Sequence, residues 1–287
     1  MSPGPPSFDL VVATVGRVAE LERLLDSLAA QAHRSFRVIV VDQNPDDRLA
    51  PALSRDDLDI VRLTEAPGLS RARNRALDLL AAEVVAFPDD DCIYPPTQLE
   101  RVAERLARDP ELDGLAARNA DLDGRSDPGW PSSGTRLTKA NVWNLVASAG
   151  IFLRRSVVSR VGRFDERLGL GSGKPWSSGE ETDYVIRALE AGARIEYDPS
   201  LVIEHALAAH DPKGLRVRGR REGSSVGYLL RKHRYPLTTL ARMAVRPLGG
   251  AGVALATGDV ANARFHAETF VGRIQGYVGA RRSNSSE

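Results

Sequence analysis

Residues 84–91 read VVAFPDDD, a short apolar strand that is followed at once by three aspartates. Two similar apolar runs precede it, FDLVVA at residues 8–13 and RVIVV at residues 37–41, and each also ends in polar residues. Apolar residues, mostly leucines, recur at helical spacing from Val18 to Ala32, and a second helix is predicted over residues 70–82. Continuous apolar strands joined by helices are typical of a parallel sheet covered on both faces. The predicted fold class is therefore α/β.

The polar residues that end these strands are expected to meet at one edge of the sheet. Thr14 follows the first strand, Asp42 follows the second, and the aspartates follow the strand at residues 84–87. In such sheets, ligands bind beyond the carboxyl ends of the strands. The sequence thus predicts a ligand site at this edge.

The composition limits the class of protein. The 287 residues are 42% hydrophobic and 27% charged, which excludes a disordered or collagen-like chain. The single cysteine, Cys92, excludes a disulfide framework and suits a reducing compartment. The first ten residues carry no secretory signal, and the uncharged run 247–258 is shorter than the ~20 residues that span a bilayer. We therefore expect a cytoplasmic protein.

Positive charge is concentrated in the C-terminal part of the chain. Residues 211–287 contain 14 Lys/Arg and 5 Asp/Glu, although the formal net charge of the whole chain is only +1. One interpretation is an amphipathic segment that contacts the inner face of a membrane or another anionic partner. The other is an ordinary helix packed on the rest of the protein or between subunits.

Two acidic motifs have both a functional and a structural interpretation. Asp89 and Asp91, at i and i+2 after a strand, can hold Mg²⁺ or Mn²⁺ and leave positions open for phosphate oxygens; a solvated acidic turn is the alternative. The sequence SGEETD at residues 178–183 opens a predicted helix. Its acids suit a general base, but Ser178 and Glu181 also have the spacing of a capping box.

Two further motifs contain basic residues. In GLSRARNR at residues 68–75, Arg71, Asn74 and Arg75 lie on one helical face near a helix N-terminus, which suits a phosphate group; a solvated basic face is the alternative. Strands are also predicted at residues 145–153 and near residues 194–197 and 201–204. His205 ends the last of these strands, and the five histidines do not form a zinc-binding set.

Taken in order, these motifs resemble the family 2 glycosyltransferases of the GT-A fold, of the type that assembles bacterial exopolysaccharides and other surface glycans. The resemblance covers about residues 8–210. It implies a Rossmann-like, mostly parallel sheet flanked by helices, with a C-terminal helical extension. The implied segments are a nucleotide-sugar-binding half (1–118), an acceptor-binding half (119–210) and a basic, mostly helical extension (211–287).

The resemblance also implies roles for individual residues. The implied donor-binding residues are Thr14, Arg17, Asp42, Arg71, Asn74, Asp89 and Asp90. The implied metal ligands are Asp89, Asp91 and His205. Glu181 matches the general base, and Asp183 is its rival because relatives usually have Glu-Asp where this chain has Glu180-Glu181. Glu180 and Trp176 are candidates for acceptor binding, although a packing role for Trp176 is equally open. Many relatives also carry a serine where this chain has Asn44.

The implied activity is an inverting, metal-dependent sugar transfer from a UDP-, dTDP- or GDP-type donor to a hydroxyl of a glycan, lipid-linked or small-molecule acceptor. Two alternatives stay open. One is a non-catalytic nucleotide-fold module tethered to membrane or nucleic acid by its basic segment. The other is a nucleotidyltransferase, which needs a glycine-rich loop where residues 13–17, ATVGR, supply one glycine. The enzyme is not expected to bind nucleic acid, and its oligomeric state stays open.

Overall fold

The computed structural model describes residues 5–126, 129–205 and 212–283. The chain forms two compact units, of which the first comprises Met1–Phe164 and Tyr184–Leu207 and the second comprises Asp165–Asp183 and Ala208–Glu287. Residues on both sides of the predicted boundary at 118 belong to the first unit. The predicted boundary at 210 lies outside the described residues. The stretch 165–183, expected in the acceptor-binding half, belongs instead to the unit of the C-terminal helices.

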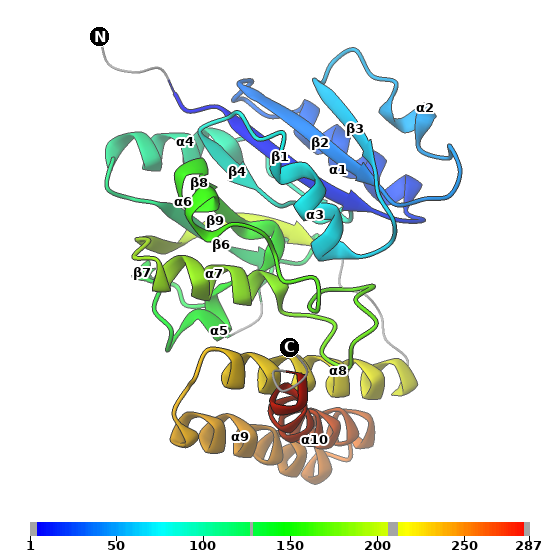
Figure 1. Ribbon diagram of the computed structural model, residues 1–287, viewed down its shortest axis with the longest axis vertical. Helices are drawn as coiled ribbons and strands as arrows, with labels where there is room; N and C mark the ends of the chain where they lie inside the picture. Colours follow the sequence, from blue (N-terminus) through cyan, green and yellow to red (C-terminus); the bar gives the residue numbers. More distant parts are fainter. Residues whose placement is uncertain (1–4, 127–128, 206–211, 284–287) are drawn as a thin grey trace. The chain divides into compact units, whose positions relative to one another are not determined.

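The N-terminal half of the first unit has the predicted α/β arrangement (Figure 1). Its elements are β1 (Phe8–Thr14), α1 (Val18–Ala29), β2 (Phe36–Asp42), α2 (Ala50–Leu53), β3 (Ile60–Thr64), α3 (Leu69–Leu77) and β4 (Val84–Ala86). The strands lie in the order β3-β2-β1-β4, and all four run parallel. Because the register sets Thr14 directly beside Asp42, the carboxyl ends of β1 and β2 meet at one edge as predicted.

Apolar side chains explain why these residues form these elements. Leu10, Val11 and Val12 of β1 point alternately to the two faces of the sheet and are all fully buried, so both faces are covered. Helix α1 buries its leucines at positions 21, 24, 25 and 28, which form one helical stripe. Burial of each such side chain contributes roughly 1.5–3 kcal/mol.

The second half of the first unit makes the sheet mixed rather than parallel throughout. Its elements are β5 (Cys92–Ile93), α4 (Gln98–Arg108), β6 (Gly114–Ala120), β7 (Thr135–Arg136), α5 (Val142–Leu145), a 3-10 turn (Ser148–Gly150), β8 (Ile151–Arg154), α6 (Arg155–Val161), helix α7 (Glu180–Glu190) from Tyr184 onward, and β9 (Ile195–His205). The full order is β3-β2-β1-β4-β8-β6-β9-β5, with β7 on β9. Strand β8 is antiparallel to β4 and β6, whereas β6 and β9 are parallel.

Two predicted elements of this half are wrong in detail. The apolar run 145–153 is not one strand, because only β8 is extended and Gly150 turns tightly against β6, where a Cβ would lie 2.9 Å from the Ala117 carbonyl oxygen. The two strands expected around residues 194–204 are one strand, β9. Its register with β6 shifts at Ala117/Arg118, and the Arg118 side chain donates a hydrogen bond of 3.0 Å to the Pro199 carbonyl. This irregularity lets β9 pass through a proline.

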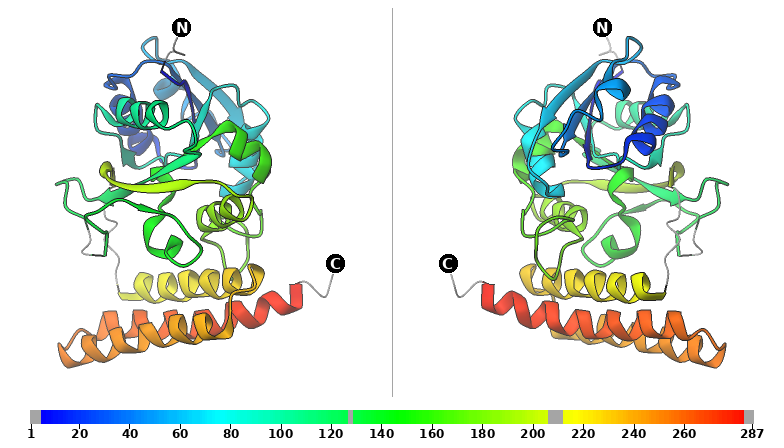
Figure 2. Two further views of the ribbon diagram at one scale, coloured as in Figure 1. Left: turned by 90° about the vertical axis from the view of Figure 1, so that its left-hand side faces the viewer. Right: turned by 90° about the vertical axis from the view of Figure 1, so that its right-hand side faces the viewer.

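The second unit contains three helices, α8 (Pro212–Lys232), α9 (Leu237–Ala256) and α10 (Val260–Ser283), and α10 packs against both of the others (Figure 2). Glycines 219, 223 and 227 of α8 face the carbonyl groups of residues 265, 269 and 273 of α10. These contacts advance in the same direction along both helices, so α8 and α10 run parallel. A Cβ at Gly223 would lie 2.3 Å from the carbonyl oxygen of Thr269, so the two backbones approach closely only because glycine has no side chain.

No helix in the described ranges is both long enough and apolar enough to cross a bilayer.

Candidate active site

The chain topology brings the ends of β1 and β9 to the aspartate run. Asp89 pairs with Ala13 in an isolated parallel bridge at the end of β1. Strand β5 then runs antiparallel to β9, so that Cys92 lies opposite His205. The predicted meeting of polar residues at this edge is therefore confirmed, and His205 joins them.

The carboxylate of Asp91 contacts two basic side chains. Its Oδ1 lies 2.9 Å from Nε2 of His205, and its Oδ2 accepts a hydrogen bond from the guanidinium of Arg17. Burial alone would raise the pKa of Asp91, but the contacts with His205 and Arg17 outweigh burial and lower this pKa below its usual value. Asp91 is therefore a carboxylate at neutral pH with an imidazole beside it.

Asp90 is buried and shares Arg17 with Asp91. The Arg17 guanidinium lies 2.9 Å from Oδ1 of Asp90. Burial raises the pKa of Asp90, and the positive charge of Arg17 offsets only part of this rise. Partial burial lowers the pKa of Arg17, but the two carboxylates more than compensate and raise it. Asp90 thus positions Arg17, and the predicted donor contacts of both residues stay predictions.

Asp89 contacts a buried arginine that the sequence motifs did not single out. Arg73 of α3 is only 1% exposed, and its guanidinium lies 3.3 Å from Oδ1 of Asp89 and also contacts the Ser148 hydroxyl. The guanidinium carbon lies 5.7 Å from the ring centroid of Phe87 and 5.5 Å from that of Phe164. Two aromatic rings and a carboxylate therefore hold this charge beside the first aspartate. In the sequence, the nearby small apolar residues Ala72 and Ala76 were the feature that could have indicated a buried helix face at Arg73.

The other polar residues of α3 differ in their exposure. Arg71 and Arg75 are exposed, whereas Asn74 is buried. The Asn74 side chain accepts a hydrogen bond of 2.7 Å from the Phe164 backbone N–H and donates one of 3.0 Å to the Phe164 carbonyl. These contacts give Asn74 a structural role, and nothing in them supports its predicted contact with a donor. Arg71 keeps its predicted role as a prediction.

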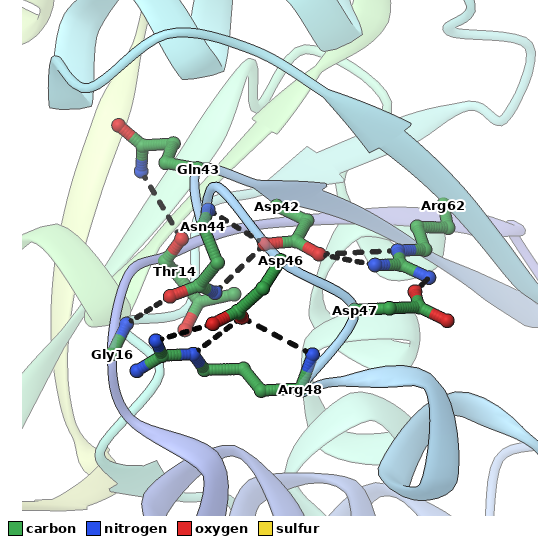
Figure 3. Close-up of polar contacts among 9 residues, drawn as sticks. All are labelled: Thr14, Gly16, Asp42, Gln43, Asn44, Asp46, Asp47, Arg48 and Arg62. Atoms are coloured by element: carbon green, nitrogen blue, oxygen red, sulfur yellow. Dashed lines mark hydrogen bonds and ion pairs between the residues drawn. The ribbon is translucent and has the colours of Figure 1, made fainter.

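Asp42 forms the centre of a hydrogen-bond network at the ends of β1 and β2 (Figure 3). The side chain is 1% exposed, and Arg62 donates to its Oδ2 at 2.6 and 3.1 Å. The backbone N–H and the side-chain amide of Asn44 donate to Oδ1 at 2.9 and 2.7 Å. The Asn44 side-chain oxygen accepts from the Gly16 N–H at 2.7 Å. Asn44 therefore connects Asp42 to the loop that carries Arg17.

Gln43 connects the same loop to α3. Its side chain contacts the Thr14 carbonyl at 3.5 Å and accepts a hydrogen bond of 2.7 Å from the Gly68 N–H, just before α3. Thr14 is itself buried, at 1% exposure. Thr14 and Asp42 are thus buried at this edge of the sheet, where they hold the neighbouring loops in place. Their predicted contacts with a base or ribose stay predictions.

The first turn of α7 carries three acids, Glu180, Glu181 and Asp183, of which only Glu181 is partly exposed. Asp183 is 0% exposed, and its Oδ1 lies 2.7 Å from the Lys232 ammonium and 2.8 Å from Nε2 of His233. A buried carboxylate between two basic groups is held in place as part of an ion-pair network. Glu181 is the more accessible of the two candidate bases.

The capping box proposed for α7 does not form at Ser178. The helix begins at Glu180, so Gly179, at φ 79°, precedes it in the N-cap position. The Ser178 hydroxyl instead lies 2.7 Å from that of Ser225 on α8. The structural explanation for Glu181 is weaker as a result.

Trp176 packs within the second unit. Its ring stacks on Tyr228 with centroids 4.6 Å apart and planes 13° from parallel, and the residue is 8% exposed. A Cβ at Gly279 would lie 2.9 Å from the indole. These contacts favour the packing role, and nothing in them supports a platform for an acceptor.

The side chains around Asp91 supply some, but not all, of the ligands that a small divalent cation needs. Within the described residues, no three His, Cys, Asp or Glu side chains are grouped as a complete metal site. Asp91 and His205 nevertheless place a carboxylate oxygen and an imidazole nitrogen 2.9 Å apart, and Asp89 is one-third exposed nearby in sequence. Oxygen and imidazole ligands with water- or phosphate-filled positions are compatible with Mn²⁺ and, for the carboxylates, Mg²⁺.

Comparison with known proteins gives consistent results. Residues 9–161 match the sequence model of "Glycosyl transferase family 2". The chain is 31% identical over 239 residues to the pre-mycofactocin glycosyltransferase of Mycobacterium tuberculosis, covering 73% of this chain and 45% of that protein. The chain thus spans about half the length of this relative.

Two solved structures are similar in fold. The mannosyltransferase PcManGT from Pyrobaculum calidifontis, in complex with GDP-Man and Mn²⁺, has a TM-score of 0.67 at 16% identity, covering 94% of this chain and 87% of that chain. TarS 1–349 of S. aureus, in complex with UDP-GlcNAc, has a TM-score of 0.60 at 16% identity, covering 96% and 92%. At these identities the likeness shows the fold alone, and it confirms the predicted fold class.

Proposed function

Because the chain belongs to glycosyl transferase family 2, we propose that it transfers a sugar from a nucleoside-diphosphate sugar to a hydroxyl acceptor with inversion at the anomeric carbon. The observation that carries this proposal is the contact of Asp91 with both His205 and Arg17 at the carboxyl end of the sheet. Ligands of open α/β sheets bind at this edge. An ionised carboxylate, an imidazole and a guanidinium together suit a diphosphate and its counter-ion.

The residues that would hold a divalent ion are Asp91, His205 and Asp89. A bound Mg²⁺ or Mn²⁺ would supply positive charge to offset the charge that develops on the leaving diphosphate. His205 and Arg17 lower the pKa of Asp91, so the Asp91 carboxylate is ionised, as a metal ligand must be. The presence of Mn²⁺ in the PcManGT complex supports a metal of this kind.

The proposed donor is a UDP-, dTDP- or GDP-sugar. Arg17 is half-exposed and Arg71 is exposed, so both side chains are accessible from solvent, and guanidinium groups suit phosphate oxygens. The two solved structures contain GDP-Man and UDP-GlcNAc, which supports the class of donor without selecting the base. The network around Asp42 and Asn44 holds the loop that carries Arg17 in place for this contact.

Glu181 is the proposed general base. In the reaction, the acceptor oxygen forms a bond to the anomeric carbon while the bond from that carbon to the diphosphate oxygen breaks, and its electron pair leaves with the diphosphate. The acceptor hydroxyl proton passes to the Glu181 carboxylate. Glu181 is preferred to Asp183 because Asp183 is fully buried and bound to Lys232 and His233. A single displacement needs one base and no covalent intermediate.

Release of nucleoside diphosphate from a panel of UDP-, GDP- and dTDP-sugars, with Mn²⁺ and simple sugar acceptors, tests this proposal. We expect one nucleotide class to be turned over, and Glu181→Gln to lower the rate by ~100-fold or more with nucleotide binding retained. The matched control is Glu190→Gln at the other end of α7, a half-exposed carboxylate that contacts Lys139. Unchanged turnover in Glu181→Gln, or equal losses in both variants, would reject Glu181 as the base.

A further inference from the structure

Helix α9 presents an apolar stripe on its exposed side. Leu237, Val245, Leu248 and Leu255 are 68%, 59%, 45% and 63% exposed, respectively. At 100° per residue they fall within one quarter of the helix circumference, and the intervening positions 241 and 252 are alanine and glycine. Single exposed apolar side chains are ordinary on a protein surface, whereas a continuous stripe of them marks an interaction site.

The opposite side of α9 is already used within the second unit. Ala244, Pro247 and Ala254 are buried, and a Cβ at Gly250 would lie 2.8 Å from the His266 ring of α10. Figure 2 shows α9 beside α10. The helix is therefore packed on one side and leaves its apolar stripe on the other.

Positive charge predominates around the stripe, and the nearest acids in the sequence are Glu222 and Asp259. Residues 223–258 contain five Lys or Arg and no Asp or Glu. Arg242 and Arg246 are both exposed on α9. At 100° per residue they lie about 60° and about 100° beyond the Val245 edge of the stripe, with the exposed Val253 between them. An apolar face bordered by arginines is typical of helices that lie in the interface of an anionic bilayer.

The turn between α8 and α9 adds a basic pocket next to Leu237. A cavity of about 470 Å³ is lined by Arg231, Lys232, Arg234, Tyr235 and Tyr277. Lys232 is paired with Asp165 and Asp183, whereas Arg231 and Arg234 are exposed. Arg234, just past the C-terminus of α8, has φ 54°, a left-handed conformation that favours glycine.

We propose that α9 and the α8–α9 turn form a docking surface for an anionic lipid bilayer. The stripe enters the acyl boundary, Arg242 and Arg246 lie at headgroup level, and the pocket at Arg231 and Arg234 takes one lipid phosphate. A second copy of the chain is the less favoured occupant, because pairing two such faces would bring arginines together with no acid in residues 223–258 to neutralise them. This proposal is independent of the proposed sugar transfer.

Vesicle flotation of the full chain tests the proposal, with phosphatidylcholine vesicles compared with phosphatidylcholine–phosphatidylglycerol vesicles. We expect binding to the anionic vesicles at least ~10-fold above neutral ones, and weaker binding in high salt. The double variant Val245→Glu/Leu248→Glu should lose at least ~10-fold of this binding. Replacing Arg242 and Arg246 by glutamine should lower it about fivefold for each arginine.

The control variant is Leu79→Glu/Leu122→Glu, which adds the same charge at two exposed leucines of the first unit. It should bind vesicles as the unchanged protein does, and circular dichroism melting should show that all variants fold. Equal loss in the control and stripe variants would overturn the proposal, as would absence of binding to either vesicle. Concentration-dependent dimerisation that Val245→Glu/Leu248→Glu abolishes, without vesicle binding, would assign the stripe to a second copy instead.

Discussion

Asp183→Asn tests whether Asp183 is a structural acid or the catalytic base. Asp183 is 0% exposed and lies 2.7 Å from Lys232 and 2.8 Å from His233, so its substitution removes one charge from a buried ion-pair network. Breaking a buried ion pair costs about 3–5 kcal/mol. Lys232 retains its contact of 2.8 Å with Asp165, which places the expected loss at the lower end, about 3 kcal/mol.

Urea unfolding followed by far-ultraviolet circular dichroism measures this loss. Asp78→Asn is the matched control, because Asp78 pairs with Arg163 where both side chains are 59% exposed, and such pairs contribute about 1 kcal/mol or less. Below its unfolding transition, Asp183→Asn should still bind nucleoside diphosphate. A variant of unchanged stability that has lost sugar transfer would refute the reasoning and identify Asp183 as the base.

Three further substitutions test other parts of the structure. Gly223→Ala should lower the free energy of unfolding by about 1–3 kcal/mol, because its Cβ would meet a carbonyl oxygen at 2.3 Å. Gly249→Ala, with open space around it, should be neutral or slightly stabilising, and equal effects of the two substitutions would contradict the glycine contact. The pKa of Asp165 is lowered because Arg167 and Lys232 outweigh its burial, so its stabilisation is complete above about pH 4 and lost as the pH falls below that value. Urea midpoints of Asp165→Asn should therefore fall less steeply with acid than those of the unchanged protein, and identical slopes would contradict this. Arg73→Met should lower the free energy of unfolding, measured by thermal unfolding, by about 2–3 kcal/mol. This loss is smaller than that for a fully buried pair because Asp89 is one-third exposed. A neutral effect would contradict the proposed packing of the Arg73 charge.

The parallel half of the sheet followed directly from the sequence. The runs that form β1, β2 and β4 are apolar and bounded by turns, and strands of this kind bury both faces. Parallel register then requires their carboxyl ends to share an edge, which is where Thr14 and Asp42 lie side by side. Local pattern and topology agree in this part of the chain.

The remaining differences come from contacts between distant parts of the chain. The run 145–153 is apolar apart from Ser148, and its period does not show that Gly150 must turn against β6. Arg73 is in the same motif as Arg71, but only tertiary packing against Phe87 and Phe164 makes it a buried partner of Asp89. Such contacts join residues separated by many positions, which spacing alone does not reveal.

The choice between the two candidate bases also depends on contacts between residues that are distant in the sequence. Glu181 and Asp183 are two residues apart in a helical turn, and the sequence left both open. The structure favours Glu181, because Lys232 and His233, about fifty positions further along the chain, contact Asp183. Trp176 is similar, since its stacking on Tyr228 of α8 favours packing and could not be read from the sequence.

Calorimetric titration of UDP, GDP and dTDP with Mn²⁺, repeated in EDTA and with Asp91→Ala, tests the central claim most directly. The account predicts metal-dependent binding of one nucleotide, which Asp91→Ala abolishes and the surface control Asp78→Asn retains. Binding that is unaffected by Asp91→Ala, or no binding of any of the three to the folded protein, would contradict a nucleotide-sugar site at Asp91 and His205.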